Sequence, residues 1–290
     1  HGTNPAARLS QLYYVCNRVT IDAQVSPHST GERDLAVEHL NFVNEGDLIL
    51  YDRGYPAVWF WVLHLQKQVN FCARVPVDSS IQIREFVASG RREKVVTYNC
   101  IEKSLRKCRD LGLPTTPIKL RLLRINLGKG NFEILITSLR DTKKYPHKYF
   151  KELYHQRWFI EEDYKLMKSR VELENFSGLS PESVKQDIHA KILAKNISAM
   201  SVIDATPLVE EKCKGRALNY QINFSQALSR LKDNLPRFIL NVANKTLYEN
   251  LIIQVSKCVN AIRPNRKFDR EDDQMRKRRR CHNMAYKRVV

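Results

Sequence analysis

Two segments near the start of the chain have β-like patterns of apolar residues, and the second alternates between apolar and polar residues as half-buried strands do. They lie between Arg8 and Val25, on either side of a break at Asn17-Arg18, and predict a β-hairpin. Ser29-Thr30-Gly31-Glu32 then has the spacing of a capping box and predicts a helix that ends near Asn44. The continuous apolar run at residues 48–51 predicts a strand buried on both faces.

The pattern continues to switch between helix and strand. Pro56 suits the first turn of a helix that residues 59–65 fill, and residues 71–75 return as a strand. This β-β-α-β-α-β order predicts the α/β class. Residues 77–145 change character, and Gly, Pro and charged turns there separate three strand-like segments at 94–98, 118–126 and 132–138.

The last third of the chain is predicted to be helical. Pro146 begins a long predicted helix, and Ser180-Pro181-Glu182 caps another. More helices are expected around residues 224–231 and 247–259. The final segment, residues 262–290, carries eleven Lys or Arg and four Asp or Glu. It fits either an extended contact with DNA or a solvated tail.

The long helix after Pro146 carries the candidate chemistry. At roughly 100° per residue, Tyr154, Arg157, Glu161 and Lys168 fall within an arc of about 60° on one face. A carboxylate can hold a divalent cation, whereas Arg and Lys bind phosphate oxygens and Tyr offers a hydroxyl. The face therefore predicts a phosphate site. The alternative is a solvated helix with i,i+4 pairs such as Arg157 with Glu161.

The charge of the chain fits a polyanionic partner. Forty-nine Lys and Arg against thirty-one Asp and Glu give a net charge of +18 and a pI of about 9.7, although ribosomal and membrane-surface proteins can look the same. The seven cysteines form no C-x-x-C pair, so neither a zinc site nor a disulfide framework is indicated. The apolar stretch at residues 57–65 is too short to span a bilayer and no leader sequence is seen, so we expect a cytoplasmic protein without a membrane partner.

Two motifs resemble those of a known family. The Y-x-x-R-x-x-x-E-x-x-x-x-x-x-K arrangement of residues 154–168 is similar to the signature of DDE transposases in the bacterial insertion-sequence-four group. Residues 46–55 resemble the strand and D-R-G-Y turn that carry that group's second catalytic Asp. Further similarity runs from Pro5–Ser10 through Glu32–Ala36 to Asn283–Arg288.

The resemblance implies an α/β, RNase H-like mixed sheet flanked by helices, with its first strand missing. Residues 1–76 would form the first part of this core, 77–145 a β-rich insertion, and 146–203 the second part with the catalytic Glu helix. Residues 204–290 would form a helical C-terminal region with a basic tail.

The resemblance also implies a function and a site. It implies metal-dependent DNA cleavage and strand transfer in DNA transposition of an insertion sequence. Asp52 and Glu161 would be catalytic and hold two Mg²⁺ (or Mn²⁺) ions, and Tyr154, Arg157 and Lys168 would bind DNA. Trp158 would either stack on a base or pack against the core. The expected partners are double-stranded DNA, comprising transposon ends and target, and a second copy in a homodimer on DNA.

The family's first catalytic Asp has no counterpart in this chain. It belongs to an Asp-Gly-Ser/Thr motif upstream of the segment that residues 5–10 resemble, and we interpret His1-Gly2-Thr3 as a coincidental likeness. Asp22 matches an ordinary family position and is not expected to substitute. A truncated, catalytically inactive DNA-binding remnant is therefore the alternative, and we expect the 290 residues alone to be inactive. An RNA-binding or ribosome-associated protein is a third hypothesis, supported by charge alone.

Overall fold

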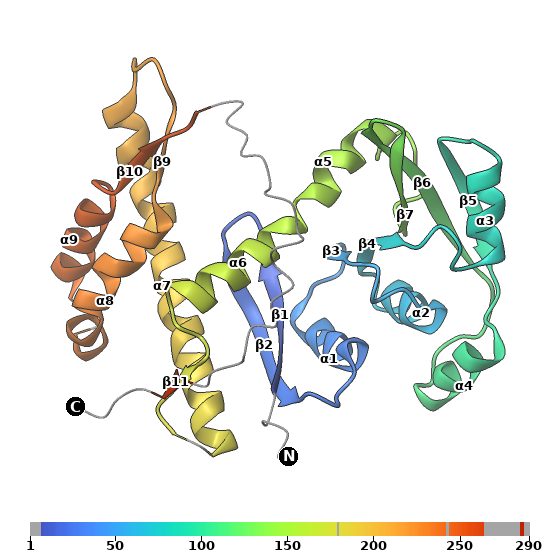
Figure 1. Ribbon diagram of the computed structural model, residues 1–290, viewed down its shortest axis with the longest axis horizontal. Helices are drawn as coiled ribbons and strands as arrows, with labels where there is room; N and C mark the ends of the chain where they lie inside the picture. The colour runs from blue at the N-terminus through green and yellow to red at the C-terminus, as the bar shows by residue number, and fades with distance from the viewer. Residues whose placement is uncertain (1–6, 179, 242–243, 264–284, 287–290) are drawn as a thin grey trace. The chain divides into compact units, whose positions relative to one another are not determined.

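The computed structural model describes residues 7–178, 180–241, 244–263 and 285–286. The start of the chain, including His1-Gly2-Thr3, and most of the basic tail lie outside the described residues. The chain divides into two compact units (Figure 1). Unit 1 comprises His1–Leu12 and Asp22–Ile160, and unit 2 comprises Tyr13–Ile21 and Glu161–Val290.

The predicted hairpin is confirmed, and the predicted helix after it starts differently. Strands β1 (Ala7–Tyr14) and β2 (Val19–Pro27) form a two-stranded sheet. Helix α1 (Glu32–His39) continues as the 3-10 turn η1 (Leu40–Phe42). Its N-cap is Gly31, without a side-chain hydrogen bond. The predicted capping box is wrong, because Glu32 is the first helical residue and not the third, where it could reach back to Ser29.

The centre of unit 1 is a five-stranded mixed sheet in the order β3-β4-β7-β6-β5, flanked by helices and compatible with an RNase H-like fold (Figure 1). Strand β3 is parallel to β4, and the other neighbours are antiparallel. All five strands were predicted, and residues 77–145 supply three strands to the same sheet as β3. The bounds are β3 Leu48–Tyr51, β4 Asn70–Val75, β5 Glu93–Tyr98, β6 Ile118–Gly128 and β7 Asn131–Thr137.

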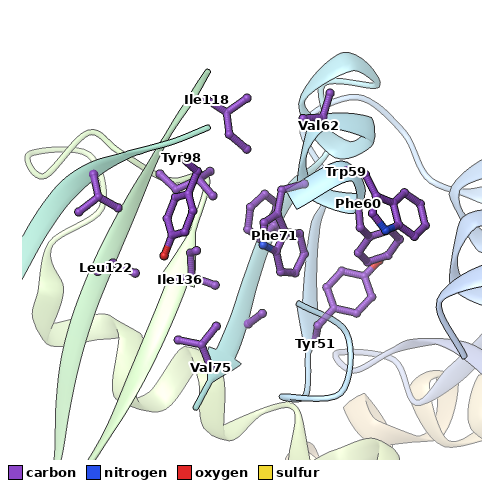
Figure 2. Close-up of a cluster of buried hydrophobic side chains, with 14 of the residues drawn as sticks. Tyr51, Trp59, Phe60, Val62, Phe71, Val75, Tyr98, Ile118, Leu122 and Ile136 are labelled. Carbon is purple, nitrogen blue, oxygen red and sulfur yellow. The ribbon is translucent and has the colours of Figure 1, made fainter. Parts of the chain in front are cut away.

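One face of this sheet carries the larger hydrophobic core. Helices α1, α2 (Val58–Gln66), α3 (Ile81–Ala88) and α4 (Glu102–Asp110) all contribute buried side chains to it. Figure 2 shows Trp59 and Phe60 of α2 with Tyr51 on one side of Phe71, and Tyr98, Leu122 and Ile136 on the other. Helices α3 and α4 were not predicted, because both are short and lie in a region dominated by strand patterns.

The opposite face carries a smaller core under α5 (Phe150–His155). Phe150 and Tyr154 pack there with alternate residues of the strands, including Cys72, Leu123 and Leu135. Arg121 is buried on this face and donates to the carbonyl oxygens of Leu139 at 3.2 Å and Tyr145 at 2.8 Å. Its guanidinium lies 5.2 Å from the ring of Phe150. The start of α5 is therefore fixed to the sheet.

Two further predictions need correction. Leu48, Ile49 and Leu50 are only partly buried, because β3 lies at the edge of the sheet that the described residues form. The long helix expected after Pro146 is three pieces, η2 (His147–Tyr149), α5 and α6 (Trp158–Ser169). It breaks at residues 156–157, where Arg157 N–H donates to Tyr154 and Phe159 N–H to Gln156, three residues back instead of four. The predicted continuous face is interrupted there.

Unit 2 is mainly helical. Helix α7 (Pro181–Cys213) begins with Ser180 as its N-cap, as predicted, and the Ser180 hydroxyl accepts from Ser183 N–H. Helix α7 packs with α8 (Phe224–Leu240) and α9 (Lys245–Val255), which confirms the predicted helices in that region. Two small sheets pair β9 (Tyr220–Ile222) with β10 (Val259–Ala261), and β8 (Asn175–Phe176) with β11 (Ala285–Tyr286).

Helix α7 is also long and apolar enough to cross a membrane, judged by length and composition alone. A core helix of a soluble protein passes the same test. Lys195 lies near the middle of α7 and is fully buried in an ion pair with Asp163 of α6.

Candidate functional site

Asp52 lies where β3 ends, as the sequence predicts. Leu48 and Leu50 of β3 pack towards the face that carries α5, and Asp52 has the same alternation. Its side chain is 42% exposed, so the carboxylate is open to solvent. The Asp52 carboxylate accepts a hydrogen bond from the N–H of Arg53 at 2.7 Å. The fold thus places one accessible carboxylate at the carboxyl end of an edge strand.

Charged side chains from the neighbouring strands surround Asp52. Arg74 of β4 donates from Nη2 to Asp52 Oδ1 at 2.9 Å. Its Nη1 lies 3.9 Å from Oε2 of Glu133 on β7. The three residues occupy adjacent strands, beyond the apolar positions Leu50 and Cys72 on the same face. The apolar face under α5 therefore ends in a charged patch.

The pKa values of the two carboxylates in this patch are shifted in opposite directions. Burial alone would raise the pKa of Asp52, but the Arg53 amide and the charges of Arg157 and Arg74 outweigh burial and hold it below its ordinary value. Burial raises the pKa of Glu133 above its ordinary value, against the charges of Arg74 and Arg157. Asp52 is therefore kept ionised near neutral pH, as a metal ligand must be.

Arg157 and Tyr154 flank the same patch from the α5 side. The Arg157 guanidinium lies 5.9 Å from the Tyr154 ring and 5.8 Å from the Trp158 ring. Tyr154 is buried, and its hydroxyl donates to the carbonyl of Tyr51 at 3.1 Å. That bond fastens α5 to the residue before Asp52. Trp158 is 36% exposed, which is compatible both with stacking on a base and with packing against the core.

Glu161 and Lys168 lie on α6, in the part of the chain assigned to unit 2. They are seven residues apart in one helix and therefore share a face. Lys168 Nζ lies 2.9 Å from Oε1 of Glu174, in an exposed ion pair. The structure brings Asp52, Tyr154 and Arg157 together within unit 1. That Glu161 and Lys168 join them stays a prediction.

The donor set at Asp52 suits a hard divalent cation in part. Within the described residues no group of three or more His, Cys, Asp or Glu side chains is placed to hold a metal ion. Mg²⁺, however, is usually held by one or two carboxylates together with water and substrate phosphates. An ionised and accessible carboxylate such as Asp52 fits that chemistry.

Asp22 is engaged elsewhere in unit 1. Its Oδ2 accepts from Nδ1 of His39 at 2.6 Å and from Nε2 of Gln24 at 2.8 Å, and His39 Nε2 lies 2.9 Å from Ser10 Oγ. This chain of contacts ties α1 to both strands of the hairpin. Both contacts to Asp22 end on Oδ2, and the expectation that Asp22 does not substitute as a metal ligand stays a prediction.

Arg74 and Glu133 were missed by the sequence reasoning. A signal for Arg74 existed, because it is the one charged residue in the run Asn70–Val75, whose other members except Asn70 are apolar and buried. A charge in such a strand usually has a partner. The partnership with Glu133 depends on the register of β4 with β7 and has no signature in the sequence.

A cavity of about 230 Å³ lies in unit 2 and has no predicted site residue in its wall. It is bordered by the turn at residues 16–18, by α7 and by β9, and its wall contains both polar and apolar side chains. It is not part of the candidate site.

Comparison with known proteins gives consistent matches. Residues 10–197, which include every predicted site residue, match the family described as "Transposase DDE domain". The chain is 25% identical over 237 residues to the transposase InsG for insertion sequence element IS4 of Escherichia coli (strain K12), covering 78% of this chain and 51% of that protein. It is 25% identical over 176 residues to the putative transposase y4zB of Sinorhizobium fredii (strain NBRC 101917 / NGR234), covering 60% and 46%. The chain spans about half the length of these relatives.

Proposed function

This chain belongs to the DDE transposase family, in its insertion-sequence-four group, and we propose that it is the catalytic domain of an enzyme that cuts DNA at transposon ends and joins them to target DNA. The observation that carries the proposal is the ionised, accessible carboxylate of Asp52 at the end of β3, beside two guanidinium groups. The substrate is double-stranded DNA, and the protein works as a homodimer on DNA in the bacterial cytoplasm.

In the proposed site, Asp52 and Glu161 hold two divalent ions, Mg²⁺ or Mn²⁺. Such ions activate the attacking oxygen and stabilise the leaving oxygen of an in-line displacement at phosphorus. DDE transposases generally use divalent ions, and Asp52 fits them because its carboxylate is ionised and open. Glu161 is assigned from its place in the signature.

The cationic residues of the signature bind phosphates in this proposal. Arg157 presents a planar fork of donors that suits phosphate oxygens, and Lys168 adds a point charge. Tyr154 also belongs to the signature, and its hydroxyl is already used by the Tyr51 carbonyl. It therefore acts in part by holding α5, and with it Arg157, against the end of β3.

A second candidate is a DNA-binding remnant without catalytic activity. The observation that favours it is that these 290 residues contain no Asp-Gly-Ser/Thr sequence, the motif that carries the family's first carboxylate. In this case the phosphate contacts of Arg157 and Lys168 remain, but the ligand set for the ions is incomplete.

A cleavage assay separates the two candidates. The 290 residues are compared with a version extended by an upstream strand that carries Asp-Gly-Ser, on DNA containing the ends of the element, with Mg²⁺. We expect both to bind DNA and only the extended version to cut it. In the extended version, Glu161→Gln or Asp52→Asn should abolish cleavage with affinity almost intact, since each removes a metal ligand and little phosphate contact. Arg157→Ala should weaken binding and cleavage together.

The control is Glu162→Gln, which changes the adjacent carboxylate on α6. Glu162 pairs with Lys165 on the solvent side, so cleavage should stay normal. Normal cleavage by the Glu161→Gln variant would show that Glu161 is not a metal ligand. Failure of the extended version to cut under any condition would favour the inactive remnant.

A further inference from the structure

Arg74 lies between two carboxylates and is only partly satisfied by them. Its Nη2 donates to Asp52 at 2.9 Å, whereas the 3.9 Å from its Nη1 to Glu133 is too long for a hydrogen bond. A guanidinium has five N–H donors. Among the described residues its buried Nε has no hydrogen-bond partner. Arg74 therefore holds Asp52 tightly and Glu133 loosely.

Strand pairing fixes the backbone of Arg74, and its side chain is partly exposed. Arg74 is directly opposite Leu135 in the β4–β7 pairing, and Glu133 is two residues further along β7 on the same face. The Arg74 side chain is 35% exposed. Its guanidinium can therefore exchange one carboxylate for the other by side-chain rotation, without a change in the sheet.

The charges of the patch determine when such an exchange occurs. Asp52 and Glu133 bring two negative charges, and Arg74 and Arg157 bring two positive ones. A divalent ion on Asp52 adds two positive charges beside the Arg74 guanidinium and repels it. Glu133, whose Oε2 lies 3.9 Å from Arg74 Nη1, is a second carboxylate that can receive it. Because the Glu133 side chain is only 16% exposed, water competes less for its carboxylate than for a fully exposed one.

We propose that Arg74 is a movable counter-ion of Asp52, which occupies the Asp52 carboxylate in the absence of a divalent ion and turns to Glu133 when the ion binds. This inference rests on the proposed function, because that function assigns Asp52 to the metal ion. Glu133 is then a positioning residue that acts through Arg74, and Arg74 sets how readily Asp52 accepts a metal.

Titration of the 290-residue chain with Mn²⁺, followed by calorimetry, tests the first half of the proposal. Arg74→Gln should tighten Mn²⁺ binding about threefold to fivefold, the range expected when one half-exposed ion pair no longer competes. The matched control is Arg106→Gln, which removes an exposed guanidinium from α4 and should change nothing. An unchanged or weaker affinity in the Arg74→Gln variant would overturn the proposal.

The second half of the proposal concerns Glu133. Glu133→Gln should weaken Mn²⁺ binding, because the displaced guanidinium then has no carboxylate to receive it. In a chain that already carries Arg74→Gln, the same change should have no effect. An equal loss in both backgrounds would make Glu133 a direct metal ligand and contradict the role given to Arg74.

Asp52→Asn separates failure of this inference from failure of the proposed function. If Mn²⁺ binding survives Asp52→Asn unchanged, the metal role of Asp52 is wrong and the inference falls with it. If Asp52→Asn abolishes binding but Arg74→Gln brings no gain, only the inference is wrong. If the unmodified chain takes up no Mn²⁺, Asp52 does not act as a metal ligand in this chain and the inference falls with that role.

One readout needs no substitution at the site and so does not depend on how a variant folds. In the unmodified chain labelled with ¹⁵N-arginine, the Nε–Hε resonance of Arg74 should shift when Mg²⁺ is added, and that of Arg106 should not. A stationary Arg74 resonance at saturating Mg²⁺ would contradict a change of partner.

Discussion

Each of the two units contains an aspartate paired with a cation, and the two pairs differ in exposure. In unit 1 the side chains of Asp52 and Arg74 are 42% and 35% exposed. In unit 2 those of Asp163 and Lys195 are 5% and 0% exposed. Lys195 Nζ donates to both carboxylate oxygens of Asp163 at 2.9 Å and to the hydroxyl of Thr20 at 2.6 Å.

The difference separates a structural pair from the one to which we assign a function. An ammonium group has three donors, so Lys195 is saturated by its three acceptors, whereas Arg74 uses few of its five. Burial raises the pKa of Asp163 and lowers that of Lys195, so both groups lose hydration in the fold. A saturated and buried pair cannot change partners. The open pair at Asp52 can, which is what binding a metal or a phosphate requires.

The largest expected effect comes from breaking the buried pair. Lys195→Met should cost about 3–5 kcal/mol of unfolding free energy, because it leaves the Asp163 carboxylate buried without its partner. Replacing both, as in Asp163→Leu with Lys195→Met, should recover most of the loss. Urea unfolding followed by far-UV circular dichroism measures this, because unit 2 is mainly helical.

Lys168→Met is the matched control for that prediction. Lys168 forms an exposed ion pair with Glu174 on the same unit, so its loss should cost less than about 1 kcal/mol. Equal losses for the Lys195 and Lys168 variants would show that the buried pair is not a structural anchor.

A buried histidine extends the comparison to unit 1. His64 has no exposed surface, accepts a hydrogen bond from the Tyr51 hydroxyl at 2.9 Å and donates to the Phe60 carbonyl at 2.7 Å. Burial lowers its pKa from 6.5 to about 4. The neutral ring is favoured in the fold, so stability is complete above pH 6.5 and falls, by on the order of 3 kcal/mol, as the pH drops towards 4.

This pH dependence is measured by urea unfolding at pH 7 and near pH 4.5. Trp59, Trp61 and Trp158 all belong to unit 1, so tryptophan fluorescence reports on that unit. In His64→Gln the stability should be lower at pH 7 and less dependent on pH. An unchanged pH dependence in that variant would mean that His64 is not the titrating group.

Removing the open carboxylate should have a smaller effect on stability. Asp52→Asn is expected to change the unfolding free energy by less than about 1 kcal/mol, because the pair with Arg74 is half-exposed. The same variant should lose metal binding. A decrease of several kcal/mol in the unfolding free energy, measured by tryptophan fluorescence, would show that Asp52 is a structural residue like Asp163.

The smallest effect concerns the basic tail, most of which lies outside the described residues. Residues 262–290 carry eleven basic and four acidic side chains, a difference of seven positive charges. Contacts with phosphates release counterions, so affinity should fall as salt rises, similarly for transposon-end and unrelated DNA. A chain that ends at Ala261 should show a flatter plot of log affinity against log salt. Identical slopes would mean that the tail is a solvated extension.

The sequence patterns predicted the elements that depend on residues close together in the chain. The alternation and apolar runs placed β3, β4, β6 and β7 to within two residues, and hence Asp52 at a strand end. The break at residues 156–157 was missed, because no Pro or Gly marks it. The Arg74–Glu133 contact was missed because the pairing of β4 with β7 joins segments about sixty residues apart.

The central claim, that Asp52 and Glu161 share a metal site, is tested most directly by iron-mediated cleavage of the protein itself. Fe²⁺ bound in place of Mg²⁺ reduces added hydrogen peroxide to a hydroxide ion and a hydroxyl radical, ascorbate reduces the Fe³⁺ formed, and the radicals break the backbone close to the ion. We expect breaks near residues 52 and 161 that disappear with excess Mg²⁺ and in the Asp52→Asn variant. Breaks near only one of these residues, or breaks that persist in Asp52→Asn, would contradict the claim.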